Sequence, residues 1–290
     1  MDRDVCLIVN PRAGAGRAAA RLPQVEAALR ERGLRFRVER TTSLEHAREL
    51  GRSARAAGEV AATLGGDGLA GAVAGELRGG EVPLAVLPGG RGNDFCRKLG
   101  IPQDPVAACD IIAAGSVRAV DVALAGDRSY LGIASAGFDS DVQEIVNGTR
   151  LKLGAAVYVY GTLRALGGWR PARWTVTVDG EAAEFSGYSV AVANSGMFGG
   201  GMRYVPGASL DDGMLDVVFV AEAPKRHFLA SLPKAFKGTH VDDPNFSVRR
   251  GREVSFRADR AFAVYADGDP IADLPCTITV APRALRVLAP

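Results

Sequence analysis

The sequence has no apolar run long enough to cross a membrane and no large excess of charge of either sign. Its 290 residues hold 35 Lys and Arg against 33 Asp and Glu, for a net charge of +2. A spanning helix needs about 20 mostly apolar residues, and binding of nucleic acid by bulk charge needs a strongly basic domain. The apolar run near the N-terminus is too short for a signal peptide. We therefore expect a soluble protein with no transmembrane segment and no nucleic acid partner.

Cysteine is scarce as well, with four residues at positions 6, 96, 109 and 276. None forms a C-x-x-C pair, and none lies near a histidine at metal-ligand spacing, so nothing indicates a thiolate metal site. Cys6 falls in an apolar segment, where a buried reduced thiol is the simplest interpretation. The pattern favours a reducing compartment, and we expect a cytoplasmic protein.

The first part of the chain alternates predicted strands and helices. Apolar runs predict the strands, and apolar residues at helical spacing predict the helices between them. The strands are expected at residues 5–9, 35–40, 60–64, 84–87 and 118–124, and the helices at 18–32, 44–57, 69–77 and 105–114. Such alternation is typical of a parallel sheet covered by helices on both faces.

After about Asp121 the pattern changes to short alternating strands. The segment RWTVTVDGEAAEF indicates a hairpin with an Asp-Gly turn, and further short strands follow at regular spacing, interrupted by helices near 154–166 and 225–237. This is typical of an antiparallel sandwich or barrel. We predict a doubly wound α/β domain at 1–123 and a β-sandwich-like domain at 124–290, whose last residues are candidates to return to the first domain. The cleft between the domains is the expected ligand site.

Three glycine-rich loops follow predicted strands of the first domain. They are NPRAGAGRA at 10–18, GGDGLAG at 65–71 and PGGRGND at 88–94. Ligands of an open parallel sheet bind at the carboxyl ends of the strands, so the loops should meet at one edge. Glycine lets backbone N–H groups approach phosphates, and Arg12, Arg17 and Arg91 add charged donors. We interpret the set as a nucleotide polyphosphate site; tight turns without a ligand are the alternative.

The second loop spells the dinucleotide fingerprint G-x-G-x-x-G, but its context differs. That fingerprint belongs to the first strand–helix unit and is followed about 20 residues later by an acidic residue at the end of the next strand. Here it follows the third strand, and the fourth ends in Pro88 and Gly89. The Walker A pattern G-x-x-x-x-G-K-[ST] is absent. Neither the usual dinucleotide site nor a P-loop is therefore expected.

Together with other segments, these loops resemble the bacterial diacylglycerol kinase catalytic-domain family. Its members are soluble lipid kinases, similar to sphingosine and ceramide kinases and more distantly to NAD kinases. The likeness runs nearly end to end, through VNPRAGAGRA, LGGDGLAGAV, LAVLPGGRGNDFCRKLGIP, GFDSDV, AVANSGMFGGGMRYVPGASLDDGMLDVV and ADGDPIADLPCTITVAPRALRVLAP. The resemblance implies an ATP-dependent kinase that uses Mg²⁺ and phosphorylates a lipid alcohol such as diacylglycerol.

The resemblance also implies which residues bind the nucleotide and its metal. ATP would lie over the G-G-D-G loop between the domains, and the aspartate inside that loop would hold Mg²⁺ through water rather than touch phosphate. The nucleotide-binding set is Asn10, Pro11, Arg12, Ala13, Gly14, Thr41, Gly65, Gly66, Asp67, Gly68, Leu69, Ala70, Gly71, Arg91, Asn93 and Asp269. The acidic metal cluster is Asp67, Asp94 and Asp121, with a helix N-cap as the alternative for Asp94.

Two further segments carry implied roles. ADGDP matches the family's D-G-E-P segment, which places Asp267 at the general base and Asp269 where the family usually has Glu. The Asp267 carboxylate would mainly orient the acceptor hydroxyl. The alternative is that this segment forms only a hairpin turn. GASLDDGML matches a second magnesium loop, with the Asp212 side chain and the Ser209 and Met214 carbonyls as ligands. A simple turn before a strand is an alternative of equal weight.

Three residues depart from the family pattern. The family usually reads G-G-D-G-T-x-N and P-x-G-T-x-N-D-F, whereas this chain has Leu69 for Thr, Gly71 for Asn and Arg91 for Thr. A hydroxyl and an amide are lost near the phosphates, and a guanidinium is gained. A non-catalytic nucleotide- or lipid-binding relative is therefore one alternative, and an NAD kinase-like enzyme, which shares the G-G-D-G logic, is another. We favour an active lipid kinase, because the acidic residues Asp67, Asp94 and Asp267 are all present.

The two predicted helices of the second domain bear on the acceptor. Residues 154–169 are apolar and include Tyr158 and Trp169, which suits core packing, an acyl-chain pocket or a membrane interface. Residues 225–237 carry several lysines, which suit anionic headgroups or a solvated face. We expect the lipid acceptor to be met at a membrane surface by a peripheral protein. Exposed strand edges in the second domain are candidates to pair with those of a second copy, which would form a homodimer.

Overall fold

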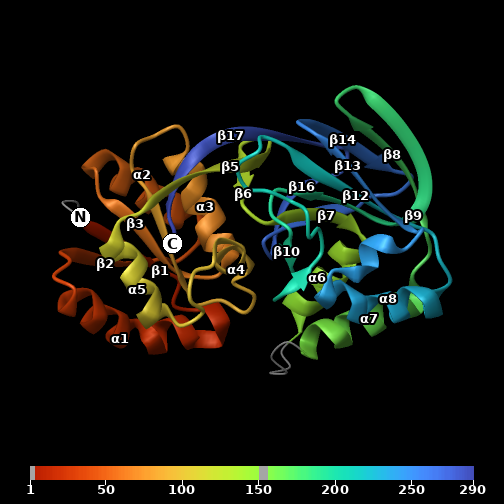
Figure 1. Cartoon of the computed structure of the whole chain (residues 1–290). Coiled ribbons are helices and arrows are strands. Elements are labelled where there is room, and N and C mark those ends of the chain that lie inside the picture. The colour runs from red at the N-terminus through yellow and green to blue at the C-terminus, as the bar shows by residue number, and fades with distance from the viewer. Residues whose placement is uncertain (1–3, 150–155) are drawn as a thin grey trace.

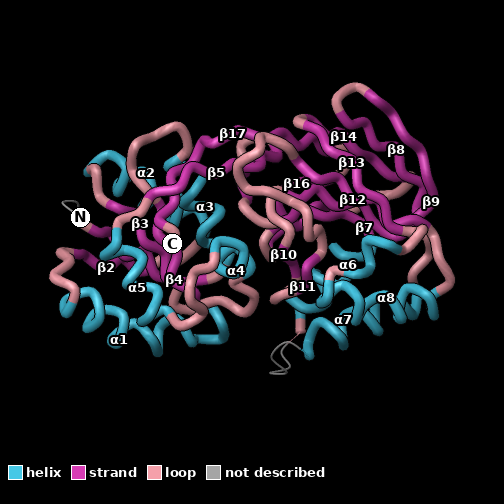
Figure 2. Tube along the Cα trace, viewed as in Figure 1, coloured by secondary structure: helices cyan, strands magenta, loops and turns pink. Residues whose placement is uncertain are grey.

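The computed structural model describes residues 4–149 and 156–290. Figures 1 and 2 show two halves side by side, one rich in helices and built from the first part of the chain, the other rich in strands and built from the rest. A single 15-stranded sheet runs through both halves. A small separate pair, β10 (Met197–Phe198) and β11 (Met202–Arg203), lies outside it.

Four parallel strands form the sheet of the N-terminal half, in the order β4–β3–β1–β2. Their bounds are β1 (Val5–Val9), β2 (Phe36–Arg40), β3 (Val60–Gly65) and β4 (Leu84–Pro88). The helices pack in pairs, α1 (Arg17–Glu31) with α5 (Pro105–Ala114) and α2 (Leu44–Ala57) with α3 (Asp67–Leu77). Every residue of β1, β3 and β4 is buried, as their apolar runs predict. The predicted doubly wound α/β half is confirmed.

Local sequence signals account for where these helices begin and end. Ser43 caps α2, since its side chain accepts a hydrogen bond from the His46 N–H at 3.0 Å, and Gly58 ends the helix with φ of 71°. Asp104 precedes Pro105 at the start of α5, which suits a proline in the first turn, and Gly115 ends it. These signals lie within a few residues of each helix end, which is why the sequence predicts both helices closely.

Antiparallel strands form most of the C-terminal half. They are β7 (Ile133–Gly137), β8 (Ala172–Val178), β9 (Glu181–Ala193), β12 (Leu215–Ala221), β13 (Phe246–Gly251), β14 (Glu253–Ala258), β15 (Ala263–Ala266) and β16 (Asp269–Asp273). β8 and β9 form the predicted hairpin, whose turn residues Asp179 and Gly180 both have positive φ, as an Asp-Gly turn requires. Figure 1 shows helices α6 (Phe138–Gly148), α7 (Ala156–Gly168) and α8 (Lys225–Lys237) along one side of these strands. The predicted β-sandwich-like half is confirmed.

Two long strands join the halves. β5 (Val117–Ala125) pairs with β17 (Cys276–Leu288) and with the short β6 (Arg128–Tyr130). β17 pairs with β14 near its start and lies parallel to β4 near its end, where Val287 pairs with Leu84. The last residues of the chain therefore lie in the N-terminal half. The predicted division after residue 123 falls inside β5, and it stays a prediction.

Several features differ from the sequence-based expectations or extend them. The short helix α4 (Asp94–Leu99), α6 and the strands β6, β7, β10, β11 and β13 were not predicted. The expected start of the helix near residue 154 lies outside the described residues. All four cysteines are buried and unpaired, as predicted for Cys6. None of the helices in residues 4–149 and 156–290 has the length and apolar content that a bilayer crossing needs.

Candidate functional site

The three glycine-rich loops meet at one edge of the parallel sheet, as predicted. They pack backbone against backbone: a Cβ on Gly14 would lie 2.5 Å from the Gly89 carbonyl oxygen, and a Cβ on Gly90 would lie 2.4 Å from the Gly66 Cα. Gly14 also has φ of 60°, in the left-handed region. Only glycine allows loops to approach this closely, so the close packing depends on these residues.

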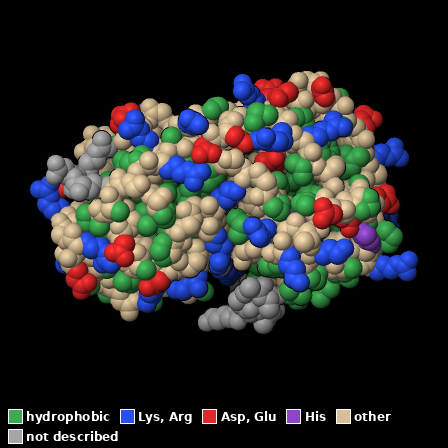
Figure 3. All heavy atoms as spheres, viewed as in Figure 1, with side chains coloured by type: hydrophobic (Ala, Val, Ile, Leu, Met, Phe, Trp, Pro, Cys, Tyr) green, Lys and Arg blue, Asp and Glu red, His purple; other side chains and the backbone are tan. Residues whose placement is uncertain are grey.

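A polar cavity of about 430 Å³ opens between the loops and the C-terminal half. Figure 3 shows Lys and Arg side chains gathered where the two halves meet. The residues lining the cavity from the predicted set are Asn10, Arg12, Ala13, Gly14, Gly66, Asp67, Gly68, Leu69, Arg91, Asp94, Asp267 and Asp269. The opposite wall was not predicted and includes Gly132, Gln143, Asn147, Tyr158, Phe198, Gly199 and Gly200. In the sequence, the glycine run at 199–201 was the feature that could have indicated this wall.

Asp67 joins two of the loops. It begins α3, and its two carboxylate oxygens accept hydrogen bonds from the backbone N–H groups of Asp94 and Phe95, each at 3.1 Å. Burial raises the pKa of Asp67, and the bond from Phe95 opposes that shift. The carboxylate is therefore a cap for α4 as well as a lining group of the cavity.

Asp94 is a buried acid whose two carboxylate oxygens have different surroundings. It is 8% exposed, and its Oδ2 accepts a hydrogen bond at 2.8 Å from the Gly200 N–H of the opposite wall. Its Oδ1 is buried, has no hydrogen-bond partner among the described residues, and lies 3.9 Å from the Arg97 Nε. Burial raises the pKa of Asp94 to about 6, with the charge of Asp67 as the second cause. Asp94 is not the N-cap of α4, because that position is held by Asn93.

Asp267 occupies the turn between β15 and β16. Asp267 and Gly268 both have positive φ, of 53° and 96°, so the hairpin-turn interpretation holds. The same turn places the carboxylate in the cavity lining, where Oδ2 accepts hydrogen bonds from the Leu131 and Gly132 N–H groups at 3.0 and 3.4 Å. Burial raises the pKa of Asp267 to about 7, and the charge of Asp67 adds to the shift. Turn and functional side chain are thus compatible.

Asp121 does not join Asp67 and Asp94. It is completely buried in β5, and it accepts hydrogen bonds from the Gly213 and Arg283 N–H groups at 2.7 and 2.6 Å. It therefore holds the 209–214 loop against β17, outside the cavity lining. The expectation of a single acidic cluster is wrong for Asp121, because its place in β5 sets it against Gly213 and Arg283 rather than in the cavity lining.

The 209–214 loop is held both by its own polar contacts and by contacts with neighbouring residues. The Ser209 hydroxyl donates to Asp211 at 2.6 Å, and Asp212 accepts from the Met214 N–H at 3.1 Å. Asp212 also pairs with Arg250. Across residues 4–149 and 156–290, no three His, Cys, Asp or Glu side chains gather closely enough to hold a metal ion by themselves. Any cation at this loop would compete with Arg250 for Asp212.

The remaining predicted nucleotide residues lie outside the lining of the cavity. These residues are Pro11, Thr41, Gly65, Ala70, Gly71 and Asn93, none of which lines the described cavity. Asn93 shapes the third loop, since its side-chain oxygen accepts from the Gly90 N–H at 2.8 Å. Gly71 lies close behind Asp267, where a Cβ would be 3.2 Å from the Asp267 Oδ2.

Models of two protein families match adjoining parts of the chain. The diacylglycerol kinase catalytic domain matches residues 4–125, and the YegS C-terminal NAD kinase beta sandwich-like domain matches 132–289. A diacylglycerol kinase of Mycobacterium tuberculosis is 33% identical over 295 residues, which cover 99% of this chain and 95% of the relative. The chain belongs to the diacylglycerol kinase family of lipid kinases.

Two other comparisons agree with the family. A Pseudomonas aeruginosa protein named "Probable lipid kinase YegS-like" is 32% identical over 294 residues, covering 100% of this lipid kinase and 96% of the relative. The crystal structure of a diacylglycerol kinase from Bacillus anthracis superposes with a TM-score of 0.77 at 23% identity, covering 99% of this chain and 97% of the other. The latter likeness shows the shared fold.

The three departures from the family pattern lie in distinct surroundings in this lipid kinase. Leu69 is 2% exposed, and its side chain packs against Gly65, where a Cβ would lie 2.6 Å from the Leu69 Cδ2. Gly71 lies against Asp267, and a Cβ there would be 3.2 Å from the Asp267 Oδ2, so an asparagine would need Asp267 to shift by a few tenths of an ångström. Arg91 is exposed, lines the polar cavity and forms no ion pair with a described residue. Two of the changes therefore affect packing, and the third adds a free cation to the cleft.

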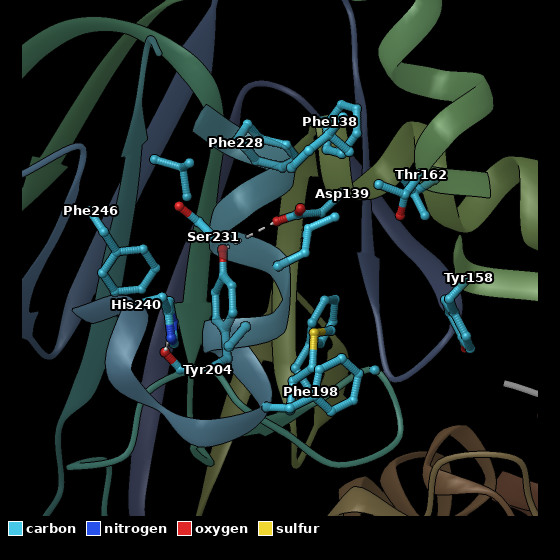
Figure 4. Close-up of a pocket in the computed structure, with 18 of the residues that line it drawn as sticks. Phe138, Asp139, Tyr158, Thr162, Phe198, Tyr204, Phe228, Ser231, His240 and Phe246 are labelled. Carbon is cyan, nitrogen blue, oxygen red and sulfur yellow. Dashed lines mark hydrogen bonds between the residues drawn. The ribbon is translucent and has the colours of Figure 1, made fainter. Parts of the chain in front are cut away.

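A second, apolar cavity of about 280 Å³ adjoins the first in this lipid kinase. Figure 4 shows Phe138 and Phe228 at one end of it and Phe198 at the other, with Tyr158 and Thr162 of α7 on the side away from His240 and Phe246. Gln143, Tyr158, Phe198, Gly199 and Gly200 line both cavities. The Tyr204 hydroxyl and Asp139 form a polar contact within it at 3.5 Å. The predicted helix at 154–169 thus contributes Tyr158 to the cavity and Trp169 to the core.

Proposed function

We propose that this lipid kinase transfers the γ-phosphoryl group of ATP to the hydroxyl of a lipid alcohol, with diacylglycerol as the simplest acceptor. The observation that carries the proposal is the junction of the two cavities, where a polar cleft with glycine loops and acids meets an apolar cavity. The polar cleft suits a nucleotide and the apolar cavity suits an alkyl chain. Relatives named diacylglycerol kinase support the acceptor class.

The donor side of the cleft would be formed by the three loops. The N–H groups at the start of α3 and the backbone of loop 10–14 can donate to phosphate oxygens, since glycine leaves them accessible. Arg12 and Arg91 line the same space and add positive charge. Such charges offset the negative charge of the transferred group, which is the main contribution a protein makes to phosphoryl transfer.

Asp67 and Asp94 fit a magnesium ion bound with ATP. The buried Asp94 Oδ1 has no hydrogen-bond partner among the described residues, and a second carboxylate lies beside it. Carboxylate oxygens are the ligands that Mg²⁺ prefers, often with water between. When bound, the ion neutralises charge on the phosphates. We also retain the Ser209, Asp212 and Met214 loop as a proposed second ion site, at which Arg250 would have to release Asp212.

The acceptor hydroxyl would lie at the junction of the cavities, within reach of Asp267. The Asp267 Oδ2 is held by two backbone N–H groups, so Oδ1 remains to accept the hydroxyl hydrogen. As the acceptor oxygen bonds to the γ-phosphorus and the bond to ADP breaks, the hydroxyl proton passes to Asp267. A pKa near 7 makes this carboxylate a better base at neutral pH than an ordinary aspartate.

An acceptor panel tests the proposal. Purified protein, labelled ATP and Mg²⁺ are incubated separately with diacylglycerol, other lipid alcohols and NAD, and label is followed into each product. We expect label in a lipid and none in NADP. Label in NADP alone would favour an NAD kinase-like enzyme instead, whereas ATP binding without any transfer would indicate a non-catalytic relative.

A further inference from the structure

Three large apolar side chains are exposed on two helices of the C-terminal half. Val159 and Leu163 on α7 are 61% and 55% exposed, and Phe236 on α8 is 55% exposed. Val159 and Leu163 are four residues apart, so they share one face of α7. Only Val117 and Val248 are comparable elsewhere in the described residues. Exposed apolar side chains that cluster in this way mark an interaction surface.

These three side chains lie at the mouth of the apolar cavity. Each lines that cavity and is also more than half exposed to solvent. Figures 1 and 2 show α7 and α8 along the same edge of the C-terminal half, and Lys225 of α8 donates to the Gly167 carbonyl at the end of α7 at 3.0 Å. The exposed apolar surface is therefore continuous with the cavity interior.

The charges on the same helices all have one sign. α8 carries Lys225, Arg226, Lys234 and Lys237 and no acid, and the single charged residue of α7 is Arg164. None of these five forms an ion pair with a residue that the structure describes. Lys234 and Lys237 are exposed and flank Phe236. We call Val159, Leu163 and Phe236, with Lys234 and Lys237, the α7–α8 patch.

We propose that the α7–α8 patch docks on the surface of an anionic lipid bilayer, so that an acceptor passes from the bilayer into the apolar cavity without crossing water. The inference rests on the proposed function in one respect, that the apolar cavity takes the acceptor. Apolar side chains that enter the headgroup region, flanked by lysines, are the combination that binds anionic interfaces. The apolar mouth gives the acceptor its route, and the lysines give the surface its preference for negative lipid.

Vesicle sedimentation tests the charge component. Wild-type protein should bind phosphatidylcholine vesicles that contain phosphatidylglycerol and bind pure phosphatidylcholine weakly. Lys234→Ser with Lys237→Ser should weaken binding to the anionic vesicles about 25-fold, since each lysine contributes about fivefold near such a surface. The control, Arg173→Ser with Arg252→Ser, removes equal charge from exposed residues of β8 and the turn before β14. Equal loss in both double variants would overturn the proposal.

A second pair of measurements separates the patch from the chemistry. Leu163→Ser with Phe236→Ser should lose binding even to anionic vesicles, whereas Val117→Ser should not. The lysine double variant should phosphorylate dihexanoylglycerol, which is soluble as a monomer, as fast as wild type. If the wild type transfers phosphate to dihexanoylglycerol but does not bind the anionic vesicles, the patch is overturned and the proposed function stands. Vesicle binding without transfer to any lipid would support the patch and remove the proposed function.

The remaining outcome concerns a protein partner. If vesicles of neither composition bind, but native bacterial membranes do so until treated with protease, the patch contacts a membrane protein. That result would overturn docking on lipid.

Discussion

Asp267→Asn should change activity and stability in opposite directions. The substitution removes the group proposed to accept the acceptor proton, so we expect kcat to fall by about 10²- to 10⁴-fold. It keeps an oxygen that can accept from the Leu131 and Gly132 N–H groups, now at 3.0 and 3.4 Å from the carboxylate. It also removes a charge that is buried close to Asp67. The variant should therefore lose activity, and its folded state should no longer contain the repulsion between Asp267 and Asp67.

The stability change depends on pH. Burial and the charge of Asp67 raise the pKa of Asp267 from 3.8 to about 7 in the folded protein. A raised pKa favours the protonated folded state, so this stabilisation is complete below the unfolded pKa and is lost as pH rises through 7. Above pH 7 the ionised group destabilises the wild type by up to roughly 4 kcal/mol, since each pKa unit is worth about 1.4 kcal/mol. Asparagine avoids that cost.

Urea unfolding of wild type and variant at about pH 5 and about pH 8.5 measures the effect, because only the higher pH ionises Asp267 in the fold. We expect a modest midpoint advantage for Asp267→Asn at the lower pH, where the carboxyl is ionised in the unfolded chain alone, and a larger advantage at the higher pH. Asp259→Asn, at an exposed position, serves as the control. Wild-type kcat/KM should rise as pH passes 7. Wild-type activity in Asp267→Asn, or a lower urea midpoint for Asp267→Asn than for wild type at the higher pH, would refute the reasoning.

Three further substitutions test other parts of the site. Gly132→Ala should lower kcat about 100-fold in steady-state assays, because its Cβ would lie 2.1 Å from the Asp267 Oδ1. The control Gly148→Ala should leave kcat unchanged, because a Cβ there meets nothing within 4 Å. Equal rates for the two variants would count against the placement of Asp267 as the base. Arg91→Thr should lower kcat/KM for ATP about tenfold, as expected for one lost charged hydrogen bond to the phosphates, and an unaltered kcat/KM would exclude that contact. Millimolar Mg²⁺ should raise the melting temperature of wild type more than that of Asp212→Asn, and equal shifts would exclude an ion at that loop.

Much of the fold was predictable because its signals are local. Mostly apolar runs define β1 and β3, and Ser43 caps α2 within its own first turn. Short elements without periodicity were missed: α4 has six residues and takes its cap from Asp67, 27 positions earlier. No window of sequence around α4 contains that interaction.

The candidate site was predictable on one side and less so on the other. The rule that loops gather at the carboxyl ends of parallel strands predicts the meeting of the three glycine loops. The opposite wall, with Gln143 and Phe198, depends on how the two halves pack, which periodicity does not encode. Asp121 illustrates the same limit, since its partners Gly213 and Arg283 are distant in sequence. Asp67 and Asp94 line the cavity, whereas Asp121, which was expected to join them, lies outside it.

Transfer of label from γ-labelled ATP to lipid tests the central claim most directly. Wild-type protein with Mg²⁺ and diacylglycerol in mixed micelles should yield labelled phosphatidic acid, and Asp267→Asn under the same conditions should yield almost none. Absence of label from every lipid class offered to the wild type, or equal label with Asp267→Asn, would contradict the account.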